Sequence, residues 1–350
     1  MTATVHVPPA TPRNGVAPPA APAPSKLGAI VRGQLRSPAR CLFYGPEGVG
    51  KSSLAADAPA PIFLDIEGGA DNIDAARYPF RDGPGGHIPR AYAEVVAAID
   101  DLTTGDHAYQ SVVIDTVDAL EALIHLHICE EYKKKNVEDF GYGKGYQVAL
   151  DVFRGLLKRL DTLRARRDVR VIFVGHSVVK PYKNPLGEDY DRYQLSVHEK
   201  TIGPKLREWC DVVGFVRFDE GAGKLAGDTA QNKRARGWST GDRVVQLAHS
   251  HAWDAKARVG LPESIVLDVQ HPWAPFGEAT ADALDTTEIG LRAEIDAELE
   301  RLGDTFTTAA GKARTAAGVR ADAAKADRST LSRMLNSLRA TATPTASQES

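Results

Sequence analysis

Cysteine is scarce in this chain of 350 residues, and its three cysteines lie far apart. Cys41, Cys129 and Cys210 show none of the paired spacings of zinc ligands, and they form no disulfide framework. The sequence therefore argues against a zinc site built on cysteine, and it is typical of a protein from a reducing compartment.

Long hydrophobic runs and an excess of one charge are also lacking. No apolar stretch approaches the length of a membrane span, and the N-terminus does not resemble a secretory signal. We therefore expect a cytoplasmic protein with no membrane partner. The net charge is −3 and the isoelectric point about 6.4, so any nucleic-acid site must be a local patch.

Composition divides the chain into four parts. Prolines deny residues 1–26 a packed structure, so this Pro/Ala-rich segment is predicted to be a disordered tail. Residues 27–274 form the predicted core. Residues 275–341 are Ala-rich and helix-prone, notably at Glu288–Leu302 and Ser329–Leu338, and predict a small helical appendage before a second disordered tail at 342–350.

Short apolar strands alternate with longer amphipathic helices through the core, which predicts an α/β fold with a mostly parallel central sheet flanked by helices. The last strands follow one another without long helices, so antiparallel strands are expected at one edge. The expected strands are Arg40–Tyr44, Pro61–Asp65, Ser111–Asp115, Val169–Gly175, Asp211–Phe218, Arg243–Ala248 and Ser264–Val269. The expected helices are Lys51–Ala58, Arg90–Leu102, Thr116–Tyr132 and Tyr146–Arg166.

A phosphate-binding loop follows the first strand. Residues 45–52 read G-P-E-G-V-G-K-S between a strand and a helix, which is the setting that this motif requires. Its glycines let backbone N–H groups point at phosphate oxygens, Lys51 supplies positive charge, and Ser52 offers a hydroxyl to Mg²⁺. The predicted nucleotide contacts are Gly45, Pro46, Glu47, Gly48, Val49, Gly50, Lys51, Ser52 and Ser53.

Acidic residues end two of the expected strands. Asp115 follows three apolar residues and is predicted to hold Mg²⁺ together with Ser52, although an aspartate there also suits a helix N-cap. Glu67 lies just beyond the second strand and is the predicted catalytic base. Asp65 shares its face, so one of these two carboxylates is expected to be structural.

His176 follows a further strand end, where a side chain can sense the γ-phosphate and pass the signal to the next loop. A histidine that caps a turn is the alternative interpretation.

The order of these motifs resembles the RecA-like recombinase superfamily over about residues 38–270. The matching pieces are G-P-E-G-V-G-K-S, F-L-D-I-E-G-G-A-D, V-V-I-D-T-V-D-A-L and V-I-F-V-G-H-S. The residues within these motifs are most similar to those of phage-encoded RecA-like ATPases, including the Sak-type single-strand annealing proteins. The resemblance implies an ATP- and Mg²⁺-dependent ATPase that forms homo-oligomers and acts on single-stranded DNA in phage DNA metabolism.

The resemblance also implies roles for single positions. Glu67 takes the place of the catalytic glutamate, and His176 that of a glutamine which couples ATP state to DNA binding. Lys256 and Arg258 resemble residues that reach a neighbouring subunit's ATP, with His249 or His251 as alternatives. The histidine at 176, and the lack of an evident polymerisation domain before the core, favour annealing over full strand exchange.

Two segments correspond to the DNA-binding loops of that superfamily, about Lys133–Gly145 and Ser177–His198. The second contains prolines and a glycine that predict an irregular, mobile loop. In both segments, acidic residues nearly balance the basic ones. The alternative interpretation of the first segment is therefore a solvated, charged surface that does not bind DNA. The predicted DNA contacts are Lys133, Lys134, Lys135, Tyr142, Lys144, Lys180, Lys183 and Arg192.

A third basic stretch, Lys233, Arg234, Arg236, Trp238 and Arg243, is expected to face DNA or an adjoining subunit. The C-terminal helices are expected to gate assembly or to dock a partner such as a single-strand-binding protein. Two further hypotheses remain open: a ring-forming DNA helicase or translocase on the same core, and a nucleotide-switched scaffold that scarcely turns ATP over.

Overall fold

The computed structural model describes residues 37–185, 187–223, 236–257, 261–284 and 288–302, together with Leu331, Met334 and Leu338. The predicted tails at 1–26 and 342–350, the start of the predicted core at 27–36 and most of the predicted helix Ser329–Leu338 lie outside these residues. None of the described helices is long and apolar enough to cross a bilayer.

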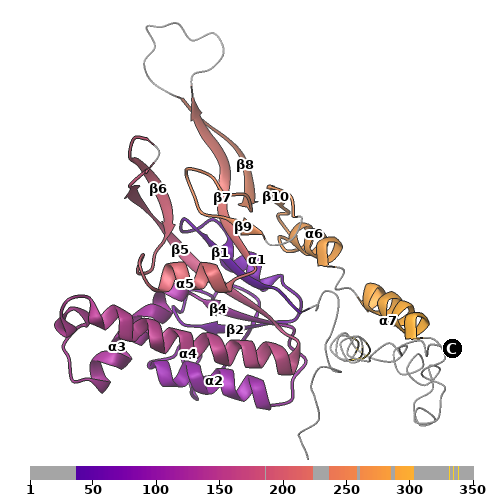
Figure 1. Cartoon of the computed structure of the whole chain (residues 1–350), viewed down its shortest axis with the longest axis horizontal. Coiled ribbons are helices and arrows are strands. Elements are labelled where there is room, and N and C mark those ends of the chain that lie inside the picture. Colours follow the sequence, from indigo (N-terminus) through magenta and orange to yellow (C-terminus); the bar gives the residue numbers. More distant parts are fainter. Residues whose placement is uncertain are drawn as a thin grey trace, which may run out of the picture.

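A ten-stranded sheet organises the described chain (Figure 1). Its order is β10-β8-β7-β1-β5-β4-β2-β3, with β6 paired to β5 and β9 to β7. The strands are β1 Arg40–Gly45, β2 Pro61–Asp65, β3 Ala76–Arg77, β4 Ser111–Asp115, β5 Arg170–Tyr182, β6 Tyr190–Leu195, β7 Val212–Gly223, β8 Arg236–Gln246, β9 Lys256–Ala257 and β10 Ser264–Leu267. Pairings from β7 through β1 to β3 are parallel, whereas β8, β9 and β10 add antiparallel strands at one edge, as predicted.

Helices cover both faces of the sheet, which explains why the central strands are apolar on both sides. One layer contains α2 Tyr92–Thr104, α3 Val117–Glu131, α4 Lys144–Arg167 and α5 Ile202–Trp209, and it encloses the larger apolar cluster. The opposite layer contains α1 Lys51–Ala56 and α6 Ala274–Leu284. The remaining elements are the 3₁₀ turn η2 Val137–Phe140 and α7 Glu288–Leu302, which has the predicted bounds.

Two antiparallel ribbons extend beyond the parallel sheet, away from the layer of α2, α3 and α4 (Figure 1). One is the outer part of β5 with β6, where Ser177 pairs with Leu195 and Tyr182 with Tyr190. The predicted irregular loop in this region was therefore wrong: the chain forms a regular hairpin, and Pro181 is accommodated within the outer part of β5. The other ribbon is the outer part of β7 with β8.

The predicted boundary at residue 274 also needs correction. Phe276 on α6 is fully buried, and its ring centroid lies 5.1 Å from that of Phe43 on β1 in an edge-to-face contact. Trp273 joins the same cluster at 4.9 Å from Phe276, and its backbone N–H donates to Asp57 after α1. The first part of the predicted appendage thus belongs to the core.

The packing of α6 predicts a large effect on stability. Replacing Phe276 with alanine should lower the free energy of unfolding by about 3–5 kcal/mol, because it removes a buried aromatic side chain and leaves a cavity. Denaturant unfolding of the full chain measures this change, and Val269→Ala is the matched control because Val269 is 89% exposed. Equal midpoints for the two variants would contradict the packing of α6 on the core.

Candidate functional site

The carboxyl ends of four neighbouring strands converge on one cavity of about 310 Å³. The parallel register aligns Asp65 on β2 with Asp115 on β4, and Asp115 with Val174 on β5, while Gly45 on β1 pairs with His176. Crevices at the carboxyl ends of parallel strands are the usual ligand sites of open α/β sheets. The cavity is lined by Gly48, Gly50, Lys51, Ser52, Ser53, Glu67, Gly69, Ile73, Asp115, Thr116, Val174, His176 and Arg243.

The predicted phosphate loop forms one wall of this cavity. It leaves β1 at Gly45, and α1 begins at Lys51, so the helix N-terminus faces the cavity. Gly50 has a φ of 90°, a left-handed conformation that favours glycine. A Cβ there would lie 2.9 Å from Arg243 Nη1, the end of a flexible side chain that can shift, so it is the conformation that requires glycine.

Lys51 is buried against its own loop. Its Nζ donates to the carbonyl oxygens of Gly45 at 3.1 Å and Pro46 at 2.7 Å. Burial lowers the pKa of Lys51, and the nearby carboxylates, Asp115 first among them, oppose this shift. A desolvated ammonium at the start of α1 is suited to a phosphate chain, because its field is weakly screened there.

Asp115 is the buried carboxylate of the cavity. Burial raises its pKa to about 6, with further upward contributions from Asp65 and Glu67, whereas a hydrogen bond with Ser52 and the charge of Lys51 act against the shift. The pairing of Ser52 with Asp115 brings together a hydroxyl and a carboxylate, both oxygen ligands of the kind that Mg²⁺ prefers. The residues present therefore fit a magnesium ion bound with a triphosphate.

The two acids after β2 have different surroundings. Asp65 is fully buried and accepts backbone hydrogen bonds from Gly68 at 2.8 Å and Ala70 at 3.3 Å, so it shapes the loop. Glu67 lines the cavity with its side chain 44% exposed and accepts a hydrogen bond from Thr116 Oγ1 at 3.0 Å. The ambiguity between them is thus resolved by position: Asp65 organises the loop and Glu67 faces the cavity.

His176 lies beside Glu67 and is oriented by α3. Its Nδ1 is 2.9 Å from Asp118 Oδ2 and 3.9 Å from Glu67 Oε2, and its backbone N–H donates to Asp118 Oδ1. The hydrogen bond with Asp118 raises the pKa of His176, although burial acts against it. Asp118 was not singled out in the sequence; its position two residues after the Thr116 N-cap was the available signal.

Arg243 on β8 is a cavity residue whose place the sequence did not reveal. It was assigned only to a basic stretch facing DNA or a subunit, but it lines the cavity beside Gly50, with its guanidinium carbon 5.9 Å from the Phe218 ring centroid. Within the described chain, no carboxylate lies within ion-pair distance of it. Of the same stretch, Lys233 and Arg234 lie outside the described residues.

The residues expected to reach a neighbouring nucleotide lie elsewhere. Lys256 on β9 does not line the cavity of its own chain, and its Nζ donates to the carbonyl oxygens of Arg207, Glu208 and Cys210 at the end of α5. Arg258 lies outside the described residues. His249 and His251 lie beside the β5–β6 ribbon, where His249 Nδ1 is 3.3 Å from Arg192 and the His251 ring packs edge-on against Tyr190.

Arg192 was wrongly predicted to contact DNA. It is only 5% exposed, and its guanidinium pairs with Asp254 at 2.6 Å, donates to the carbonyl oxygen of Trp253 and stacks over Tyr182. It ties the β5–β6 ribbon to the chain after β8. Lys180 and Lys183 lie on the same ribbon and are more accessible, paired with Glu199 at 3.4 Å and Asp189 at 2.5 Å.

The segment 133–145 presents the other predicted contacts to solvent. Lys133, Lys134, Lys135 and Lys144 are exposed, as is Tyr142, and no described carboxylate lies within ion-pair distance of these four lysines. Its acids are used locally, because Asp139 accepts from the backbone of Lys135 and Asn136 in a capping box. The four positive charges are therefore less compensated than the sequence suggested.

Fold and site together define a P-loop nucleotide-binding protein. Residues 37–259 match the model of the AAA domain family, and the chain belongs to that family. No curated protein matches the chain. Among solved structures, it is similar to the crystal structure of the RadB recombinase, with a TM-score of 0.32 and 15% identity over 69% of this chain and 91% of that one.

The contact between Asp118 and His176 predicts a change in titration. Asp118→Asn removes the charge that stabilises the imidazolium, so the pKa of His176 should fall toward the ordinary histidine value. Proton-detected NMR titration of the His176 ring measures this shift. Asp151→Asn is the control, because Asp151 is exposed on α4 and pairs with Arg154; an unchanged His176 titration in Asp118→Asn would contradict the pairing.

Proposed function

We propose that this protein is a RecA-like ATPase that binds ATP with Mg²⁺, hydrolyses it, and couples the nucleotide state to binding of single-stranded DNA in recombination or annealing. The observation that carries this proposal is the convergence of Lys51, Asp115 and Glu67 on one cavity beside the phosphate loop. The fold supports the nucleotide part of the proposal, and the exposed lysines of segment 133–145 support the DNA part.

Each residue has a distinct role in this mechanism. Backbone amides of the phosphate loop and Lys51 bind the β- and γ-phosphates, with Arg243 as a second positive contact. Ser52 and Asp115 hold Mg²⁺, which supplies charge neutralisation on the phosphate oxygens when bound. Glu67 orients the attacking water and accepts its proton.

A continuous set of contacts supports coupling between the cavity and the DNA segments. Asp118 binds His176, and Glu121, one turn further along α3, accepts the backbone N–H of His198 at 3.0 and 3.1 Å. The His198 ring stacks on Tyr146 with centroids 3.9 Å apart, and the Tyr146 hydroxyl donates to Glu138 in segment 133–145.

Both ends of the β5–β6 ribbon therefore contact α3. His176, the last residue of β5 that pairs with β1, contacts Asp118 where the ribbon begins, and β6 leads back to His198 beside Glu121. Burial raises the pKa of Glu121 to about 7, which marks this junction as a desolvated polar cluster. A movement of His176 in response to the γ-phosphate would thus be transmitted through α3 to both DNA segments, which is the coupling we propose.

Hydrolysis and binding should separate by mutation. Glu67→Gln should retain nucleotide affinity but lower turnover by at least about 100-fold, because it removes the base and leaves the phosphate contacts. Lys51→Ala should lose nucleotide affinity as well. Steady-state hydrolysis and fluorescent-nucleotide titration measure the two effects, with Lys158→Ala on the exposed face of α4 as the control. Unchanged turnover in Glu67→Gln would favour the nucleotide-switched scaffold.

Single-stranded DNA should stimulate hydrolysis, and the stimulation should fade as salt rises. Replacing Lys133, Lys134 and Lys135 together with alanine should reduce the slope of log affinity against log salt by about 0.7 for each phosphate that the lysines no longer neutralise. Fluorescence anisotropy with a labelled oligonucleotide at several salt concentrations measures the slope. The Lys158→Ala variant again serves as the control, and a slope equal to wild type would remove segment 133–145 from the DNA surface.

A further inference from the structure

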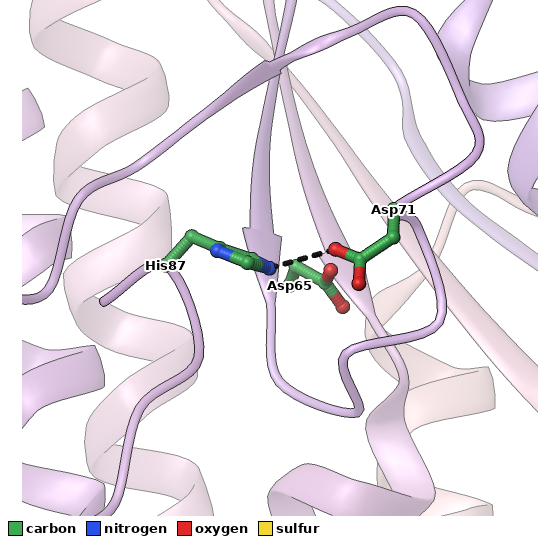
Figure 2. Close-up of side chains that lie close together, drawn as sticks. All are labelled: Asp65, Asp71 and His87. Atoms are coloured by element: carbon green, nitrogen blue, oxygen red, sulfur yellow. Dashed lines mark hydrogen bonds and ion pairs between the residues drawn. The ribbon is translucent and has the colours of Figure 1, made fainter. Parts of the chain in front are cut away.

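Outside the cavity, a second group of potential ligands lies at the end of β2. Asp65, Asp71 and His87 each offer one ligand atom, and these three atoms lie within 4.8 Å of one another. They come from three places in the chain: the end of β2, the loop that follows it, and the segment before α2. Figure 2 shows the imidazole and the two carboxylates facing a common point, with His87 Nε2 2.9 Å from Asp71 Oδ1.

Asp65 gives this group a feature that surface clusters lack. Its carboxylate is completely buried, and no described lysine, arginine or histidine pairs with it as an ion pair. Two backbone amides donate to it, which leaves a lone pair on each oxygen. Because a buried carboxylate without a counter-charge is costly, such groups are generally paired with a cation or coordinate a metal ion.

We propose that Asp65, Asp71 and His87 bind one divalent metal ion of the zinc class, separate from the magnesium ion held by Ser52 and Asp115. One imidazole nitrogen and two carboxylate oxygens suit Zn²⁺, whereas Mg²⁺ favours an all-oxygen shell. Three protein ligands leave the fourth tetrahedral position to water. Ligand atoms in such a site lie roughly 3.3 Å apart, so the loops that carry Asp71 and His87 close slightly around the ion.

The ion would fix the loop that carries Glu67. Asp65 and Asp71 bracket residues 66–70, and Gly68 in the middle of that loop lies against the neighbour of His87, since a Cβ on Gly68 would be 2.7 Å from Ile88 Cδ1. Binding therefore joins both ends of the loop to the segment before α2. The expected consequence is slower hydrogen exchange of the amides at 66–70 when zinc is bound.

Metal uptake by the full, untagged chain tests this proposal without nucleotide, so its outcome does not depend on the proposed ATPase function. After chelation and removal of the chelator, calorimetric titration with ZnCl₂ should show one ion per wild-type chain. His87→Ala should weaken this binding by at least about tenfold. His127→Ala is the matched control. His127 also neighbours a carboxylate, Glu131 at 3.7 Å on α3, but belongs to no cluster of three potential ligands among the described residues, so its loss should leave zinc affinity unchanged.

A second cluster in the cavity makes the assignment falsifiable. Glu67, Asp118 and His176 also offer ligand atoms within 4.8 Å, so zinc bound there would be lost in His176→Ala and retained in His87→Ala. That pattern, or equal affinity in wild type and His87→Ala, would overturn the proposal. Thermal unfolding in the presence of a chelator is the control for folding. The midpoint of His87→Ala should equal that of wild type, which would show that the variant loses the metal site and not the fold.

Discussion

The burial of opposite charges at the start of α1 and at the end of β4 is the constraint on which the cavity depends. Lys51 and Asp115 are both nearly inaccessible to solvent. Burial lowers the pKa of Lys51 and raises that of Asp115, so it disfavours the charged form of each. Their charges are sustained by each other, by the carbonyl oxygens that accept from Lys51 and by Ser52. Burying two such charges is costly for stability, and their placement at a sheet edge beside an anion-binding loop is typical of a functional site.

The same charges set a condition on the ligand. Asp115 and Glu67 face the cavity together, so an unaccompanied triphosphate would meet two carboxylates as well as Lys51 and Arg243. In the proposed function, a divalent cation held by Asp115 would offset this repulsion, so binding of the metal and of the nucleotide would depend on one another. Arg243 completes the balance from β8, an antiparallel strand that lies two positions from β1 in the sheet.

Sequence reasoning succeeded where a local pattern determines the outcome. The glycine-lysine loop, the strand that ends in Asp115 and the helix Glu288–Leu302 each depend on residues close in sequence, and their elements appear where predicted. It failed where the partner is distant. The charge of Arg192 suggested an accessible contact, but its acidic partner, Asp254, is 62 residues away. Phe276 likewise meets Phe43 only through the fold.

The hairpin of β5 and β6 shows a different limit. The sequence of this hairpin contains Pro181, Pro185 and Gly187, which are typical of an irregular loop. Nevertheless, Ser177 through Tyr182 pair regularly with β6. A proline interrupts a central strand because it lacks an N–H donor, whereas a two-stranded ribbon leaves one edge unpaired, and the missing donor can face that edge. Whether a segment lies at the edge of a sheet depends on which other strands pair with it. The sequence of the segment alone therefore cannot predict it.

Glu67 and His176, to which the proposed function gives roles at the γ-phosphate, are held in place by different kinds of contact. Glu67 is positioned by the backbone, since the N–H groups of Ile66 and Glu67 both donate to the carbonyl oxygen of Asp115. His176 is held chiefly through Asp118, one side chain on α3, and lies where β5 leaves the parallel sheet for the ribbon. A base that orients water needs a fixed position, whereas a sensor must move. Glu67 is anchored through its own backbone, whereas His176 is held by one side chain, and this difference is consistent with the proposal that the histidine carries the signal to DNA.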